Sequence, residues 1–163
     1  MPEKNLDKAI RDYWEDPSNI SIIDKNLHQL EIDSASAFLQ PSDCLADFGC
    51  GDGRATVQYA KKVRECFGFE RSNTLLMKAK ETLERSGVQN LRFLEGNILE
   101  QTFSEKAFDV VITQRLLSNL VSWEDQAKAI DLIRQGIKPG GRYLMIDNIK
   151  ESFDNLNQMR TKV

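Results

Sequence analysis

Three glycines at alternate positions and two acids stand together in residues 47–53, which read DFGCGDG. A short apolar run, residues 44–46, precedes this segment, and a helical pattern over residues 54–63 follows it. A strand, a tight glycine loop and a helix N-terminus in this order can hold a nucleotide-like ligand, because glycines let the backbone approach it closely. We therefore expect a ligand-binding loop at residues 47–53.

The acids of this loop indicate which ligand it suits. A dinucleotide places its pyrophosphate on the positive end of the helix, and Asp47 and Asp52 beside that position would repel it. Arg54 also occupies the place of the third glycine in the dinucleotide fingerprint. A ligand that carries an ammonium and a sulfonium group would suit both acids. The residues therefore point away from the NAD of a dehydrogenase and towards S-adenosylmethionine.

Residues 47–53 resemble the first motif of the class I S-adenosylmethionine-dependent methyltransferases, in which an acid precedes alternate glycines. Later segments extend the resemblance over residues 43–148, and residues 13–31 resemble the leader of some bacterial members. The resemblance implies an enzyme that transfers a methyl group from S-adenosylmethionine to the oxygen, nitrogen or carboxylate of a small-molecule acceptor. Family members normally add two strands after the fifth, so we expect this chain, which stops at Val163, to lack the C-terminal strands.

The composition is that of an ordinary soluble protein of one domain, with 163 residues, 40% of them apolar and 29% charged. A formal charge of -3 without basic runs argues against nucleic acid as a partner. No apolar stretch approaches ~18 residues, so we expect no membrane helix or signal peptide and a cytoplasmic location. Three scattered cysteines argue against a disulfide framework, and one histidine without a Cys/His cluster argues against a metal site.

From residue 43 onwards, strand and helix patterns alternate. We expect strands at residues 44–47, 65–69, 91–95, 108–113 and 142–147, helices at residues 54–63, 73–86 and 124–136, and a turn at residues 139–141. This order predicts an α/β fold with a doubly wound, mostly parallel, Rossmann-like sheet of about five strands and helices on both faces. Residues 43–163 would form the cofactor-binding domain.

Residues 1–42 are expected to form a helical leader or lid, with helices at residues 6–15 and 24–39. The second helix would bury the apolar positions Leu27, Leu30, Ala35 and Leu39. In the resembling family the leader folds over the cofactor cleft.

The aromatic residues Tyr13 and Trp14, together with Asn19, fall within this leader. They could form an aromatic lid that excludes water, or Tyr13 and Trp14 could pack into the core. His28 is expected at the surface or the core edge rather than in catalysis.

Polar residues follow the second and third predicted strands. Glu70 ends the second strand about twenty residues after the glycine loop, where an acid can accept hydrogen bonds from both ribose hydroxyls. Asn97 could accept a hydrogen bond from the adenine amino group while Ile98 covers the ring, or it could form a plain Gly-Asn turn. The predicted cofactor-binding residues are Asp47, Phe48, Gly49, Cys50, Gly51, Gly53, Glu70, Arg71, Asn97, Ile98 and Gln114.

Two residues are candidates for the reacting end of the site. In the resembling family, residues 113–120 lie beside the methionine part of the cofactor, where Gln114 would touch it. Arg115 could orient an anionic substrate group or pair with a neighbouring acid. Asp147, after the fifth strand, could act as a general base towards an acceptor hydroxyl or cap a following helix.

The C-terminal end of the chain leaves two questions about assembly. Phe153, Leu156 and Met159 suit the apolar face of an amphipathic helix after the fifth strand. The fifth strand would be a sheet edge, for which we expect self-association or a partner chain. An alternative to an independent enzyme is a cofactor-binding domain that serves as a partner or regulatory subunit of a complete methyltransferase.

Overall fold

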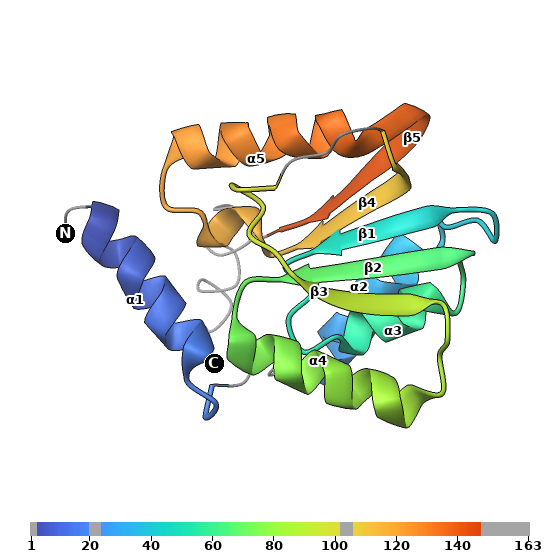
Figure 1. Cartoon of the computed structure of the whole chain (residues 1–163), viewed down its shortest axis with the longest axis horizontal. Coiled ribbons are helices and arrows are strands. Elements are labelled where there is room, and N and C mark those ends of the chain that lie inside the picture. Colours follow the sequence, from blue (N-terminus) through green and yellow to red (C-terminus); the bar gives the residue numbers. More distant parts are fainter. Residues whose placement is uncertain (1–2, 20–23, 102–105, 148–163) are drawn as a thin grey trace, which may run out of the picture.

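The structure, a computed structural model, describes residues 3–19, 24–101 and 106–147 (Figure 1). Two helices, α1 (Glu3–Glu15) and α2 (Lys25–Ser36), come first. Strands and helices then alternate in the order β1 (Cys44–Phe48), α3 (Arg54–Ala60), β2 (Glu65–Glu70), α4 (Asn73–Ser86), β3 (Leu91–Glu95), β4 (Phe108–Gln114), the 3-10 helix η1 (Leu117–Asn119), α5 (Trp123–Gly136) and β5 (Ile137–Ile146).

The five strands form one sheet in the order β3-β2-β1-β4-β5, and every neighbouring pair is parallel. The chain moves outward from β1 first to β2 and β3, then to β4 and β5. Figure 1 shows all arrowheads at one end of the sheet, with α1 beyond that end. The predicted doubly wound α/β sheet is confirmed, and its order places a ligand crevice at the carboxyl ends of β1 and β4.

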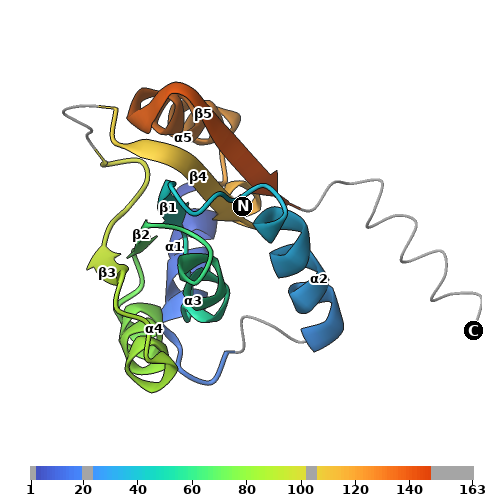
Figure 2. The same cartoon turned by 90° about the vertical axis from the view of Figure 1, so that its right-hand side faces the viewer.

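Helices cover both faces of the sheet (Figure 2). Leu45 of β1 points into a core that it shares with Ile32 of α2 and Leu76 of α4. Ala46, the next residue of β1, points into the opposite core with Ile133 of α5. This alternation follows from the period of two residues along a strand, which sends successive side chains to opposite faces.

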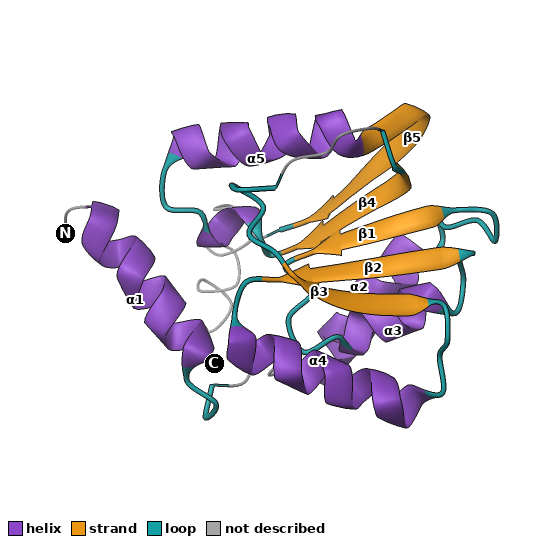
Figure 3. Cartoon of the chain, in the orientation of Figure 1, coloured by secondary structure: helices purple, strands orange, loops and turns teal. Residues whose placement is uncertain are grey.

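Side-chain caps fix where the helices begin. The carboxylate of Asp24 accepts hydrogen bonds from two backbone N–H groups of the first turn of α2, and the hydroxyls of Ser72 and Ser122 accept one each at α4 and α5. Gly87, with φ +71°, ends α4 in the left-handed conformation. These local signals explain why the predicted range for α4, residues 73–86, agrees with the structure (Figure 3).

The apolar face that we predicted for α2 is wrong in its N-terminal half. Leu27 is 48% exposed and Leu30 is 63% exposed, whereas Ile32 and Ala35 are buried in the core. The helix also ends at Ser36 instead of continuing to residue 39. The helix therefore buries residues of its C-terminal half against the sheet, and helical spacing alone could not show where that contact begins.

The turn that we predicted at residues 139–141 does not precede the last strand, because β5 already begins at Ile137. Ile137 pairs with Phe108 and Arg142 pairs with Val110, so residues 138–141 form an irregularity inside the strand opposite a single residue of β4. Gly140 has φ +79° there, a conformation that glycine adopts without strain. The two glycines thus lie inside β5, at the irregularity in its pairing with β4, and not in a turn before the strand.

The predicted amphipathic helix with Phe153, Leu156 and Met159 lies outside the described residues. The association of β5 with another copy or a partner chain stays a prediction, and so does the division at residue 42. Within residues 3–19, 24–101 and 106–147, no helix combines the length and the apolar character that crossing a membrane requires.

Candidate functional site

A cavity of about 320 Å³ opens at the carboxyl ends of the strands. Its volume lies at the lower end of the range for small-molecule sites. Most of the predicted site residues meet here: the lining includes Asp47, Gly49, Cys50, Gly51, Glu70, Arg71, Asn97, Ile98, Gln114 and Arg115.

Three predicted site residues do not line this cavity. Phe48 is 1% exposed, and its ring stacks on that of Phe69 with centroids 4.7 Å apart. Gly53 is the N-cap residue of α3 and lies against Phe93. The Oδ2 atom of Asp147 accepts a hydrogen bond from the backbone N–H of Ser118 at 3.1 Å. Phe48 and Gly53 thus pack beneath the residues that line the cavity. Asp147 contacts the lining through its hydrogen bond with Ser118.

The glycine loop folds back over the end of β2. The backbone N–H groups of Gly49 and Cys50 both donate to the carbonyl oxygen of Phe69, at 2.8 and 3.1 Å. Gly51 has φ +59°, and a Cβ atom placed on it would meet nothing within 4 Å. Gly51 also lines the cavity, so the loop presents bare backbone to any ligand bound there.

Glu70 ends β2 with both carboxylate oxygens fixed. Its Oε2 accepts from the N–H of Gly51 and its Oε1 from the N–H of Ser72, each at 2.9 Å. Burial raises the pKa of this carboxyl, while the backbone donors lower it. Each oxygen retains a second lone pair, so the carboxylate can still accept hydrogen bonds from a ligand in the cavity.

Asp47 is the penultimate residue of β1 and is buried. The hydroxyl of Thr56 donates to its Oδ2 at 2.6 Å. Burial raises the pKa of Asp47 to about 7, and the negative charge of Glu70 adds to the rise. Two buried acids beside a glycine loop favour a cationic ligand and disfavour a pyrophosphate. The residues present therefore fit the ammonium and sulfonium groups of S-adenosylmethionine.

Asn97 lies beside the cavity, but its amide also forms a local turn. Its Oδ1 accepts from the N–H of Leu99 at 3.1 Å, and its Nδ2 donates to Glu100 at 3.0 Å. Ile98, which is 4% exposed, lines the cavity next to it. The turn that we considered as an alternative is present, and the adenine role of Asn97 stays a prediction.

Gln114 and Arg115 both donate to the same carboxylate oxygen of Glu31 on α2, at 2.6 and 3.1 Å. Arg115 has φ +56°, the one positive φ of a non-glycine residue among those described. The pairing of Arg115 with a neighbouring acid, one of our two alternatives, is therefore present. Its role in orienting a substrate stays a prediction.

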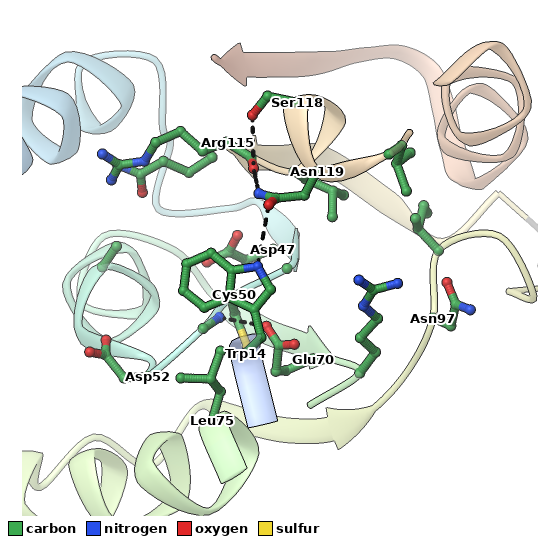
Figure 4. A pocket seen from close by; sticks show the side chains of 18 of the residues that line it. Trp14, Asp47, Cys50, Asp52, Glu70, Leu75, Asn97, Arg115, Ser118 and Asn119 are labelled. Atoms are coloured by element: carbon green, nitrogen blue, oxygen red, sulfur yellow. Dashed lines mark hydrogen bonds between the residues drawn. The ribbon is translucent and has the colours of Figure 1, made fainter. Parts of the chain in front are cut away.

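The leader reaches the cavity through Trp14. The Nε1–H of Trp14 donates to Oδ1 of Asn119 at 3.2 Å, as Figure 4 shows, and its carbonyl oxygen accepts from the hydroxyl of Ser72 at 3.0 Å. Tyr13 is 48% exposed and packs with its ring at 87° to that of Trp14. Trp14 thus bridges the two sides of the cavity, as a lid would, whereas Tyr13 does not enter the core.

Several residues that the sequence did not assign to the site also line the cavity, and two of them, Asn119 and His28, bear on its chemistry. Asn119 carries the hydrogen bond from Trp14, and its only signal was its place in a segment that resembles the family. The side chain of His28 is 11% exposed, and neither ring nitrogen has a hydrogen-bond partner in residues 3–19, 24–101 and 106–147. His28 lies at the core edge, as expected, but nothing in its spacing indicated that it also faces the cavity.

Comparisons with known proteins agree with this geometry. A family model described as a methyltransferase domain matches residues 42–162. The chain is similar to the uncharacterized methyltransferase YcgJ of Bacillus subtilis, with 28% identity over 121 residues that cover 70% of this chain and 47% of YcgJ. It is also similar to the ubiquinone/menaquinone biosynthesis C-methyltransferase UbiE of Vibrio vulnificus, with 29% identity over 124 residues that cover 74% of this chain and 46% of UbiE. The chain thus spans about half the length of these curated relatives.

Further similarities concern an RNA methyltransferase and solved structures. The 23S rRNA (uracil(1939)-C(5))-methyltransferase RlmD of Aeromonas salmonicida is 29% identical over 102 residues, which cover 59% of this chain and 23% of RlmD. The structure of phosphoethanolamine N-methyltransferase 1 from Haemonchus contortus, in complex with phosphoethanolamine and S-adenosylhomocysteine, gives a TM-score of 0.74 at 18% identity. The similarity covers 91% of this chain and 32% of that one, and it shows that the two share a fold.

Proposed function

We propose, on the premise that this chain belongs to the S-adenosylmethionine-dependent methyltransferase domain family, that it binds S-adenosylmethionine in the cavity and transfers its methyl group to a small-molecule acceptor. The observation that carries this proposal is the arrangement of Asp47, Glu70 and Asn97. They stand at or just beyond the carboxyl ends of β1, β2 and β3, three adjacent strands, and all line one cavity.

The three residues would hold different parts of the cofactor. Asp47 would attract the ammonium group, because among the described residues its buried carboxylate accepts a hydrogen bond from Thr56 and forms no salt bridge. Glu70 would accept hydrogen bonds from the ribose hydroxyls with the lone pairs that Gly51 and Ser72 leave free. Asn97 and Ile98 would contact the adenine.

The bound cofactor supplies a methyl group that its sulfonium already activates. The chain therefore has to position an acceptor in line with that methyl group, and orientation of this kind can account for much of a rate enhancement. Trp14 and Asn119 would help by closing the cavity and excluding water. Arg115 would orient the acceptor, and Asp147 would act as a base if a bound acceptor displaced its hydrogen bond to Ser118.

A small molecule is the acceptor class that we favour. UbiE and the Haemonchus enzyme are named for small-molecule pathways or substrates, whereas RlmD is named for a ribosomal RNA uracil. A formal charge of -3 supports a small-molecule acceptor, because RNA binding depends on basic surface. The reaction that we propose is methyl transfer to an oxygen, nitrogen or carboxylate of this acceptor.

Calorimetric titration with S-adenosylhomocysteine tests the binding half of the proposal. We expect micromolar binding, and a loss of at least about tenfold in Glu70→Ala, which corresponds to about 1.4 kcal/mol. Glu95→Ala is the matched control, because Glu95 ends the neighbouring strand directly opposite Glu70 and does not line the cavity. A folded chain that does not bind, or an equal loss in both variants, would contradict the proposed site.

A second candidate is a cofactor-binding domain that works as a partner or regulatory subunit of a complete methyltransferase. It is favoured by the position of Asp147, which does not line the cavity. Turnover of the chain alone with a panel of hydroxyl, amine and carboxylate acceptors separates the two candidates. Formation of S-adenosylhomocysteine supports the enzyme, and binding without turnover supports the partner domain.

A further inference from the structure

The imidazole of His28 is a buried titratable group that the proposed function has not used. His28 is the chain's one histidine and lies on α2, the helix that precedes β1. Its side chain is 11% exposed and lines the cavity, yet among the described residues neither Nδ1 nor Nε2 has a hydrogen-bond partner. Buried polar groups in proteins are nearly always satisfied, so an unsatisfied ring beside a cavity suggests that a bound molecule completes it.

Charged groups from four parts of the chain face this ring. Arg54 of α3 and Arg115 after β4 are cationic, and Glu31 of α2 and Asp52 of the glycine loop are anionic. Burial lowers the pKa of His28, the two guanidinium groups lower it further, and the two carboxylates oppose this effect. At neutral pH the imidazole is therefore uncharged and able to take up a proton.

We propose that His28 is a catalytic residue that accepts the proton of the methyl acceptor, an inference that rests on the proposed function. The acceptor belongs to the class whose nucleophilic atom has a free lone pair and carries a dissociable proton, such as a hydroxyl, a thiol or an uncharged amine. A bond forms between that atom and the methyl carbon while the bond between carbon and sulfur breaks. The sulfur leaves as a neutral thioether, and the proton goes to His28.

Glu31 acts as a positioning residue for this base. Its Oε2 lies 3.9 Å from Nδ1 of His28, beyond hydrogen-bonding distance but close enough to stabilise an imidazolium. The same oxygen accepts hydrogen bonds from Gln114 and Arg115, so the carboxylate is held in place from the end of β4. Because Nδ1 is the nitrogen on the side of Glu31, Nε2 is the atom that we assign to the proton. Nε2 is itself buried in the structure, so the ring has to turn towards the cavity for the acceptor to reach it. A base oriented by an acid in this way is a common arrangement in catalysis.

An NMR titration of the full chain tests the position of His28 without knowledge of the acceptor. The chain has one histidine, so its ring signals are identified directly. The pKa of His28 is measured with saturating S-adenosylmethionine and, separately, with S-adenosylhomocysteine. If His28 faces the reacting methyl group, the sulfonium of the first ligand lowers this pKa by about 1 unit relative to the neutral thioether of the second.

The other outcomes of this titration overturn the proposal. Equal changes with both ligands would place His28 against a part that they share, such as the carboxylate. An unchanged pKa would place the ring away from both. If calorimetry shows that neither ligand binds, the proposed function fails and the assignment of His28 fails with it.

Kinetics with a panel of acceptors supplies a second test. We expect His28→Gln to lower kcat about 100-fold, to leave the KM for S-adenosylmethionine within about twofold, and to remove the acidic limb of the pH profile. Lys25→Gln, an exposed change on the same helix, is the control and should leave kcat unchanged. An unaltered kcat in His28→Gln would contradict the proposal. An unchanged affinity for S-adenosylhomocysteine would show that His28→Gln has folded. If His28→Gln does not fold, His28→Asn takes its place in the same experiment.

The positioning role of Glu31 has its own readout. Glu31→Gln keeps an acceptor oxygen for Gln114 and Arg115 but removes the negative charge beside the ring. The pKa of His28 should then fall below its value in the unsubstituted chain, since the Glu31 carboxylate raises it. A pKa that does not change would show that Glu31 only supports the fold.

Discussion

The cavity has two walls of different origin. The glycine-loop wall consists of residues 47–53 and Glu70, with Phe48 and Gly53 behind the residues that line the cavity. Its hydrogen bonds join residues that are close in sequence, such as Gly51 and Glu70, 19 residues apart. The helix wall consists of His28, Gln114 and Arg115, which line the cavity, and of Glu31 behind them. Its bonds from Gln114 and Arg115 to Glu31 span 83 and 84 residues. One wall is built by a strand–loop–helix unit, the other by packing of the leader against the end of β4.

This difference decides what each wall can do for a ligand. In the glycine-loop wall, the carboxylates of Asp47 and Glu70 accept hydrogen bonds from the Thr56 hydroxyl and from backbone N–H groups, and neither forms a salt bridge among the described residues, so a cationic ligand does not have to displace a protein cation from them. In the helix wall, Arg115 and Glu31 largely neutralise each other, and the ring of His28 has no hydrogen-bond partner within the part of the chain that the structure describes. The first wall therefore suits binding, and the second suits proton transfer.

The largest expected effect tests how tightly the glycine-loop wall is packed. In Gly53→Ala the new Cβ would lie 2.5 Å from the ring of Phe93, at a residue with φ +75°, and we expect a loss of about 3 kcal/mol in the free energy of unfolding. Gly51→Ala is the matched control, because nothing lies within 4 Å of its Cβ position; its φ of +59° should cost about 1 kcal/mol. Urea denaturation measures both, and equal losses would contradict the packing argument.

The next effect tests the charge of the same wall. Because the pKa of Asp47 is about 7, its carboxylate is mostly protonated at pH 6 and mostly ionised at pH 8. Affinity for S-adenosylhomocysteine, whose ammonium needs the ionised form, should rise about tenfold over this interval, about 1.4 kcal/mol. Calorimetry at both pH values checks this, and Asp47→Asn should bind weakly with no such pH dependence. A variant that keeps the rise would assign it to another group.

The same carboxyl has the opposite effect on the unliganded fold. Its pKa is raised from 3.8 to about 7, so the folded state holds a proton that the unfolded chain releases. The stabilisation from that proton is complete below pH 3.8 and is lost as pH rises through about 7. Asp47→Asn should therefore remove a fall in Tm between pH 5 and pH 8.

A smaller effect is expected at Trp14, which joins the two walls. Its indole N–H bonds to Asn119 beside the helix wall, and its carbonyl oxygen bonds to Ser72 beside Glu70. In a double-mutant cycle with Trp14→Phe and Asn119→Ala, we expect a coupling of about 1 kcal/mol in the affinity for S-adenosylhomocysteine. Calorimetry of the four chains gives this quantity. Additive losses would mean that the lid does not depend on this bond.

The smallest effect concerns the helix that carries the second wall. Leu30 is 63% exposed, so Leu30→Gln should change the free energy of unfolding by less than about 0.5 kcal/mol. Ile32→Ala on the same helix should cost about 3 kcal/mol, because Ile32 is 3% exposed in the core. Urea denaturation compares the two variants. A large loss in Leu30→Gln would restore the apolar face that the sequence predicted.

The two walls also differ in how far the sequence predicts them. The ends of β1 and β2 follow from short apolar runs and from glycines that need positive φ, and these are local signals. The places of Asp47 and Glu70 in the cavity could therefore be predicted. The roles of Asn97 and Gln114 do not follow from the sequence. The amide of Asn97 also accepts a hydrogen bond from Leu99 nearby in the chain, and the amide of Gln114 donates to the distant Glu31.

The helix wall could not be predicted, because it depends on which residues of α2 pack against the sheet. The spacing of Leu27 and Leu30 suggested burial, but both are exposed, and His28 between them faces the cavity. Likewise, the glycines at residues 140–141 have the composition of a turn, yet pairing with β4 continues on both sides of them. In each case tertiary contact overrides the local preference.

The three cysteines of the chain can serve as native probes of how often the site opens. Cys44 lies in β1, Cys50 in the glycine loop and Cys66 in β2; all are buried, and burial raises the pKa of each thiol. An alkylating reagent attacks the thiolate, so each sulfur reacts only while its own region is open. The relative alkylation rates of Cys50 and Cys66 would thus report, in the unaltered chain, whether the loop breathes separately from the sheet beneath it.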